Sequence, residues 1–180
     1  MDVTARASAD SFVLNGLTIT GAIAPAVIHQ LLGEPTRIHS AGPPAPYGHR
    51  NNQIHVYDVL GLYFNEHHYT RSLTGATFVF WPEEEDYPFT PQHAFCGKLI
   101  IGDYEIPELA SEKEIIAECG LPFRDRLGGV WSLPGMIPII LDTKGAKLPS
   151  GRRSSAKRLA SVSIGWPHDP RAQPLTMRCS

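Results

Sequence analysis

The chain has 180 residues, a length that suits one full domain or two fused half-size units. Its 42% hydrophobic residues exclude wholesale disorder, and its 16 glycines and 16 prolines favour short elements with many turns over a long helical bundle or coiled coil. The formal net charge of −2 offers no general attraction to nucleic acid or to an anionic membrane, so neither is expected as a partner.

The first residues, the short apolar runs and the cysteines of the sequence predict a cytoplasmic protein. The first ten residues contain no basic stretch followed by an apolar run of signal-peptide length. The longest apolar runs, such as residues 136–141, are far shorter than the ~20 residues that a membrane-spanning helix needs. The three cysteines lack metal or redox spacing, which favours reduced thiols, with Cys96 and Cys119 as small buried side chains.

The first half of the chain predicts a hairpin, a helix and further strands. Residues 12–20 alternate around Asn15-Gly16, the strongest short signal for a β-hairpin. Residues 25–32 have the apolar spacing of a helix, with proline in the first turn and a stop at Gly33-Glu34-Pro35. After a loop at 36–50, strands are predicted over 53–64, around a turn at Gly61, and over 77–82.

The second half predicts the same series. A hairpin at 97–106 turns at Gly102-Asp103, and Ser111 to Glu114 form a capping box for a helix at 112–119 that stops at Gly120. Strands follow over 130–141, where Pro138 predicts an edge or irregular strand, and over 162–167. Residues 142–158 are predicted to form a long loop.

Matching landmark residues in the two halves are separated by a nearly constant number of residues along the sequence. Gly102 lies 86 residues after Gly16, and Trp166 lies 85 residues after Trp81. We therefore predict an α+β fold of two tandem ββαβββ-like units, with antiparallel sheets and one short helix in each. The predicted units are residues 8–82 and 95–167, with a linker at 83–94 and a tail at 168–180. Both tryptophans are expected to be at least partly buried at strand ends.

Common enzyme motifs are absent, and the remaining candidates for chemistry are weak. Nucleotide-binding, zinc-protease and nucleophile-elbow patterns were not found. His55, Asp58, His67 and His68 form the strongest cluster, but alternation along strands turns neighbouring histidines to opposite faces. The sequence therefore predicts no metal, no cofactor and no catalytic residue.

Charge is distributed unevenly along the chain. Residues 83–118 carry 10 acidic and 2 basic side chains, whereas residues 119–180 carry 3 and 10. The basic tract 144–158 suits either phosphate contacts or internal pairing with the acidic half. The linker joins four consecutive carboxylates to two aromatic residues, which is suited to docking on a basic protein surface, although a solvated linker has the same composition. The predicted partner-binding residues are Glu83, Glu84, Glu85, Asp86, Tyr87 and Phe89.

Several of these features resemble a bacterial domain family. The Asn15-Gly16 hairpin, the helix ending at Gly33-Glu34-Pro35, the Tyr57 to Leu62 strand turn and the Phe95 to Leu99 segment are similar to an uncharacterised family found among polymorphic-toxin and type VI secretion immunity proteins. The resemblance covers roughly residues 12–118. It implies a non-enzymatic protein that binds a cognate toxin or effector and occludes its active site. It carries over no functional residues, because immunity surfaces vary with their toxins. The alternative is a small hydrolase or metal-dependent enzyme that uses the His55, Asp58, His67 and His68 region.

Overall fold

The computed structural model describes residues 2–8, 10–41, 51–82, 87–107, 110–127, 130–133, 137–147 and 153–167. Within these residues the chain forms an α+β fold, as the sequence predicts, with two short helices and 13 strands. In chain order the elements are β1 (Thr4–Ala7), β2 (Phe12–Leu14), β3 (Leu17–Ile19), α1 (Pro25–Leu32), β4 (Arg37–Ser40), β5 (Gln53–Tyr57), β6 (Leu62–Glu66), β7 (Leu73–Val79), β8 (Lys98–Ile101), β9 (Tyr104–Glu105), α2 (Glu112–Glu118), β10 (Arg124–Leu127), β11 (Val130–Leu133), β12 (Ile139–Lys147) and β13 (Arg153–Gly165).

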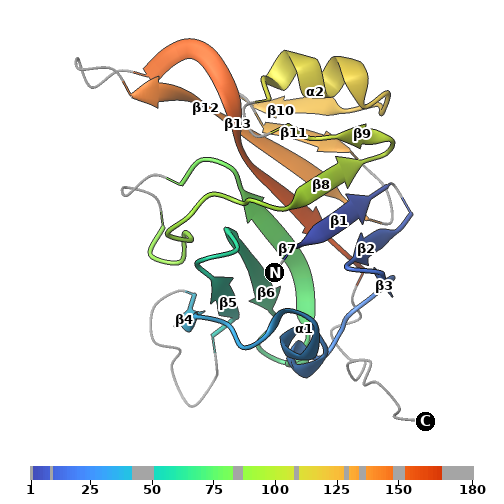
Figure 1. The fold of residues 1–180 in the computed structure, drawn as a ribbon, viewed down its shortest axis with the longest axis vertical. Coiled ribbons are helices and arrows are strands. Elements are labelled where there is room, and N and C mark those ends of the chain that lie inside the picture. The colour runs from blue at the N-terminus through green and yellow to red at the C-terminus, as the bar shows by residue number, and fades with distance from the viewer. Residues whose placement is uncertain are drawn as a thin grey trace.

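The described strands form two sheets (Figure 1). The small sheet has the order β3-β2-β1-β8-β9, and the large sheet has the order β10-β11-β12-β13-β7-β6-β5-β4. All neighbouring strands are antiparallel except β1 and β8, which run parallel.

Both sheets combine strands from the two halves of the chain. In the large sheet β7 pairs with β13 from Val79 opposite Ser161 to Gly75 opposite Gly165, so the last strands of the two series meet at its centre. In the small sheet β1 lies between the two hairpins and pairs with a strand of each. The sequence left open whether the two series share a sheet, and the structure shows that they share both. The predicted unit boundaries stay a prediction.

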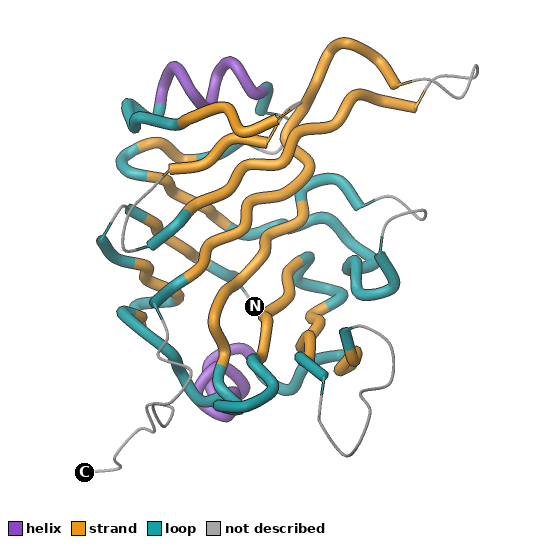
Figure 2. The backbone as a smooth tube through the Cα atoms, turned by 180° about the vertical axis from the view of Figure 1, so that it is seen from behind, coloured by secondary structure: helices purple, strands orange, loops and turns teal. Residues whose placement is uncertain are grey.

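The core lies between the two sheets. Phe12 on the small sheet contacts Phe78 on the large sheet edge to face, with ring centroids 6.3 Å apart. Phe12 also stacks on Trp166 at 5.6 Å. The helices lie at opposite margins, α1 at the bottom and α2 at the top of Figure 1, and each buries an isoleucine completely, Ile28 and Ile115 respectively. Viewed from behind, the strands of the large sheet run side by side across the molecule (Figure 2).

Local signals in the sequence explain where the helices and hairpins begin and end. Asn15 and Gly16 both have positive φ, as the type I′ hairpin turn requires. Pro25 opens α1, and the Ser111–Glu114 capping box of α2 forms in both directions. These predictions are confirmed.

Other predictions are wrong in detail. Most of the predicted loop 142–158 belongs to β12 and β13, which pair to form a long hairpin. Pro138 does not mark an edge strand, because it stands just before β12, which lies between β11 and β13, but β12 is irregular, with two register shifts in its pairing with β13. Strands β1, β4 and β10 were not predicted. Cys119 is buried, but Cys96 is exposed.

Neither described helix has the length and apolar character needed to cross a membrane.

Candidate functional site

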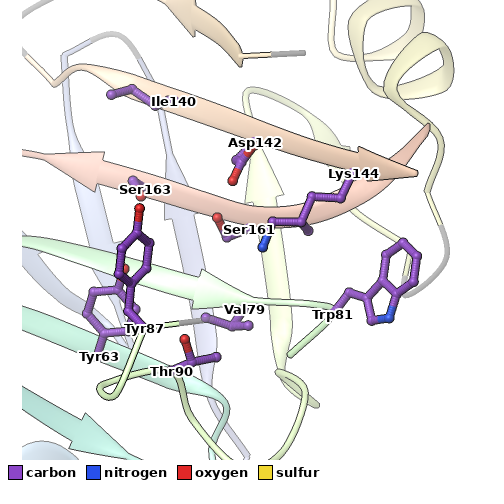
Figure 3. Close-up of a pocket in the computed structure, with 11 residues that line it drawn as sticks. Tyr63, Val79, Trp81, Tyr87, Thr90, Ile140, Asp142, Lys144, Ser161 and Ser163 are labelled. Atoms are coloured by element: carbon purple, nitrogen blue, oxygen red, sulfur yellow. The ribbon is translucent and has the colours of Figure 1, made fainter. Parts of the chain in front are cut away.

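A groove of about 280 Å³ opens on the large sheet (Figure 3). Aromatic rings, small hydroxyl side chains and one pair of opposite charges all contribute to its walls. The lining residues are Tyr63, Val79, Trp81, Tyr87, Thr90, Ile140, Asp142, Lys144, Ala160, Ser161 and Ser163.

The register of four neighbouring strands positions the sheet side of the groove. Tyr63 lies opposite Thr77, Thr77 opposite Ser163, and Ser163 opposite Ile140. Paired residues in neighbouring strands point to the same face, so these side chains form a row across β6, β7, β13 and β12. Thr77 and Ser163 are hydrogen-bonded through their hydroxyls at 3.0 Å. Alternate residues of the same strands, such as Leu141 and Val162, are completely buried on the core side. The row therefore lies on the outer face of the sheet.

One wall of the groove comes from a loop and carries an exposed aromatic residue. Tyr87 is 71% exposed, yet its ring stacks on Phe89 with centroids 5.2 Å apart and planes 1° apart. Phe89 is half-buried between Tyr63, at 5.4 Å, and His39, at 5.9 Å. Thr90 donates its backbone N–H to the Tyr87 carbonyl at 2.8 Å, which closes a turn. Tyr87 is thus held in place while most of its surface remains free.

An ion pair fixes this loop on the sheet. The guanidinium of Arg37, on β4, donates to both carboxylate oxygens of Asp58 at 2.9 and 3.0 Å. The same guanidinium donates to the carbonyls of Pro88 and Thr90. Asp58 also accepts from the backbone N–H of Gln92 at 3.0 Å. These hydrogen bonds hold the pKa of the Asp58 carboxyl below its usual value, with Arg37 as the main cause.

The predicted partner-binding residues divide into three groups. Glu83, Glu84, Glu85 and Asp86 lie outside the described residues. Tyr87 lines the groove, and the ring of Phe89 stacks against the ring of Tyr87. In the sequence the four acidic residues stand between Trp81 and Tyr87, both of which line the groove.

The strands predicted over 130–141 and 162–167 include the groove residues Ile140 and Ser163, but the sequence reasoning missed the rest of the contribution of β12 and β13. Asp142 and Lys144 fell in the segment that was predicted as a loop. Residues 161–164 alternate serine with an aliphatic residue, which is typical of a strand with one buried face, and most of this alternation lies in the predicted strand 162–167. The polar residues of that alternation are the ones that face the groove.

The residues of the alternative enzyme hypothesis are not brought together. Asp58 follows β5 at the turn of the β5–β6 hairpin, whereas His67 and His68 follow β6 at its open end. Five paired positions separate the two ends, about 16 Å at the usual rise per strand residue. His55 lies between them, 3% exposed, with Nε2 2.5 Å from the Glu66 carboxylate. Among the described residues no group of three or more His, Cys, Asp or Glu side chains is arranged to hold a metal ion.

Comparison with known proteins gives a family for the chain. Residues 5–116 match a domain of unknown function (DUF7738), and the chain belongs to this family. The match runs from β1 into α2 and includes Arg37, Asp58, Tyr63 and Tyr87, whereas the groove residues of β12 and β13 lie outside it. No curated protein and no solved structure matches the chain.

Proposed function

We propose that this chain is a cytoplasmic, non-enzymatic protein of the immunity type, which neutralises a cognate bacterial toxin or effector by binding over its active site. The observation that carries the proposal is the placement of Tyr87. A large aromatic side chain that is 71% exposed normally has freedom to lose on binding, but this one is already stacked and anchored by the Arg37–Asp58 pair. Such prior ordering reduces the entropic cost of using it as an anchor.

The neighbourhood of Tyr87 favours a basic protein surface as the partner. Four consecutive carboxylates precede Tyr87 in the sequence, and repulsion among them is relieved by a positively charged partner. The groove beside Tyr87 offers both apolar surface, from Val79 and Ile140, and hydroxyl groups, from Ser161 and Ser163. A basic or aromatic side chain of the partner fits this combination of groups.

The experiment measures binding to the product of the gene beside the one that encodes this chain. We expect Tyr87→Ala to weaken binding about 30-fold or more, as is typical for an interface hot spot. Tyr69→Ala is the matched control, because Tyr69 is 66% exposed on another loop and lines no part of the groove. Equal affinity for the Tyr87 and Tyr69 variants would place the binding face elsewhere.

The acidic segment is tested separately. Replacing Glu83, Glu84 and Glu85 by Gln and Asp86 by Asn is expected to slow association and to reduce its dependence on salt, because charge steering acts mainly on the association rate. If this variant and Tyr87→Ala both bind like the wild type over a range of salt concentrations, the proposed face is wrong.

A further inference from the structure

A series of ionisable groups, joined by two hydrogen bonds and two ion-pair contacts, runs beneath α1 and takes no part in the groove. Nε2 of His29, on α1, lies 3.1 Å from Nδ1 of His55, on β5. Nε2 of His55 lies 2.5 Å from Glu66, whose other oxygen is 2.6 Å from Nε of Arg71. At the outer end, Nδ1 of His29 lies 3.2 Å from the carboxylate of Glu34.

The inner end of this series fixes where the protons are. Glu66 is 2% exposed and faces the guanidinium of Arg71, so it acts as a carboxylate acceptor. Nε2 of His55 must therefore carry a proton, which leaves Nδ1 of a neutral His55 as an acceptor. Among the described residues, the nitrogen that faces this acceptor is Nε2 of His29, which must donate. Each hydrogen bond from His29 inward then has one direction.

Of the four ring nitrogens, Nδ1 of His29 is the one that can gain or lose a proton without breaking these hydrogen bonds. Nδ1 of His29 takes no part in the inward hydrogen bonds, so they form whether it is protonated or not. When it is protonated, it meets the Glu34 carboxylate, and His29 becomes a charged donor in an ion pair. A second added proton would have to go to Nδ1 of His55 and would place two N–H groups face to face at 3.1 Å.

We propose that the pair of histidines binds one exchangeable proton, at Nδ1 of His29, and that Glu34 receives it in an ion pair that fastens the carboxyl end of α1. Glu34 directly follows Gly33, which caps the helix and donates its N–H to the His29 carbonyl. The ion pair therefore joins the side chains of His29 and Glu34 across the same turn that the Gly33 hydrogen bond closes through the backbone. The proton acts at the junction of α1 with the turn that leads into β4.

The surroundings of His29 set the pH range. Burial lowers the pKa of His29 below 6.5, and the carboxylates of Glu34 and Glu66 oppose this while His55 adds to it. Tyr57 also lies in this environment; burial, with a smaller effect from Glu34, raises the pKa of its hydroxyl, so it stays neutral. Proton uptake is thus expected on the acidic side of the usual range for histidine.

The test follows the ring nitrogens of the full chain by NMR between pH 8 and pH 5. At pH 8 we expect both His29 and His55 to carry their proton on Nε2. As the pH falls, Nδ1 of His29 is expected to gain a proton before Nδ1 of His55 does. A neutral His29 with its proton on Nδ1, or an earlier change at His55, would overturn the proposal.

Substitution at the exposed end tests the role of Glu34 without disturbing the core. Glu34 has a side chain 83% exposed, so Glu34→Gln is expected to fold. The variant should protonate His29 at a lower pH than the wild type and should show faster amide exchange at residues 29–33 in acid, but not at pH 8. Glu118→Gln, on α2, is the matched control and should leave both measurements unchanged. A His29 midpoint that is the same in Glu34→Gln as in the wild type would contradict the proposed ion pair.

Discussion

Arg37 and Asp58 form an ion pair whose two partners differ in burial: the Asp58 side chain is 4% exposed, whereas the Arg37 side chain is 34% exposed. The pair joins β4 to the end of β5 and to the loop that carries Tyr87. A carboxylate buried in this way depends on its partner, because an uncompensated buried charge is strongly unfavourable.

Removing Arg37 should therefore destabilise the protein. We expect Arg37→Ala to lower the free energy of unfolding by about 3 kcal/mol, at the low end for a broken buried pair because Arg37 is partly exposed. Chemical denaturation measures this. Arg6→Ala is the control, since Arg6 and Asp103 are both exposed and 3.9 Å apart, and should cost less than about 1 kcal/mol. Equal losses in the two variants would contradict the role given to Arg37.

The same pair makes a specific contribution to the pH dependence of stability. The folded-state pKa of Asp58 is below its usual value, so its contribution is complete above that value and is lost as the pH falls through the lowered pKa. We expect thermal unfolding scans in the strongly acidic range to show a steeper decline for the wild type than for Asp58→Asn. Parallel curves for the two proteins would show that Asp58 does not contribute in this way.

The two tryptophans that end strands should differ in importance. Trp166 is 3% exposed, stacks on Phe12 and donates its indole N–H to the Leu73 carbonyl at 2.7 Å. Trp166→Ala is expected to cost about 3–5 kcal/mol. Trp81 is half-exposed at the groove, so Trp81→Ala should cost much less. Comparable losses of unfolding free energy would be inconsistent with this difference in burial.

Gly61 should tolerate no side chain. It has φ +69°, and an added Cβ would lie 2.2 Å from the backbone nitrogen of Phe95. Gly61→Ala must therefore displace the segment that crosses the β5–β6 turn. Gly16 has a similar φ of +85° but open space around it, so Gly16→Ala should show only the backbone cost of about 1–2 kcal/mol. We expect a clearly lower melting temperature for the first variant than for the second.

Local chemistry made part of the fold predictable. The turn at Asn15-Gly16, the proline of α1 and the Ser111 capping box each act within a few residues, so their sequence signals are sufficient. Strands β1 and β10 are short and gain their order from partners on other parts of the chain, which periodicity within four residues does not reveal. Residues 139–141 and 162–165 of the β12–β13 hairpin lie in predicted strands, but the rest of the hairpin was predicted as a loop because its basic residues resemble those of a loop.

The candidate sites depend on pairings across the sheet. The aromatic content of residues 87–89 was visible in the sequence, but its support by Tyr63 and His39 depends on how the loop crosses the strands. His29 and His55 are 26 residues apart, and their contact results from the docking of α1 on β5. Neither arrangement has a signature in the spacing of residues.

The pairing of β7 with β13 at the centre of the large sheet limits where the chain can be truncated. The segment that matches the family ends at residue 116, before β13 begins. A protein cut at that point would leave every backbone donor and acceptor that β7 presents to β13 without a partner, along a strand rich in β-forming residues. Such an edge recruits strands from other molecules. The segment recognised by sequence is thus shorter than the segment that must be expressed, and a fragment ending near residue 116 is expected to aggregate where the full chain remains dispersed.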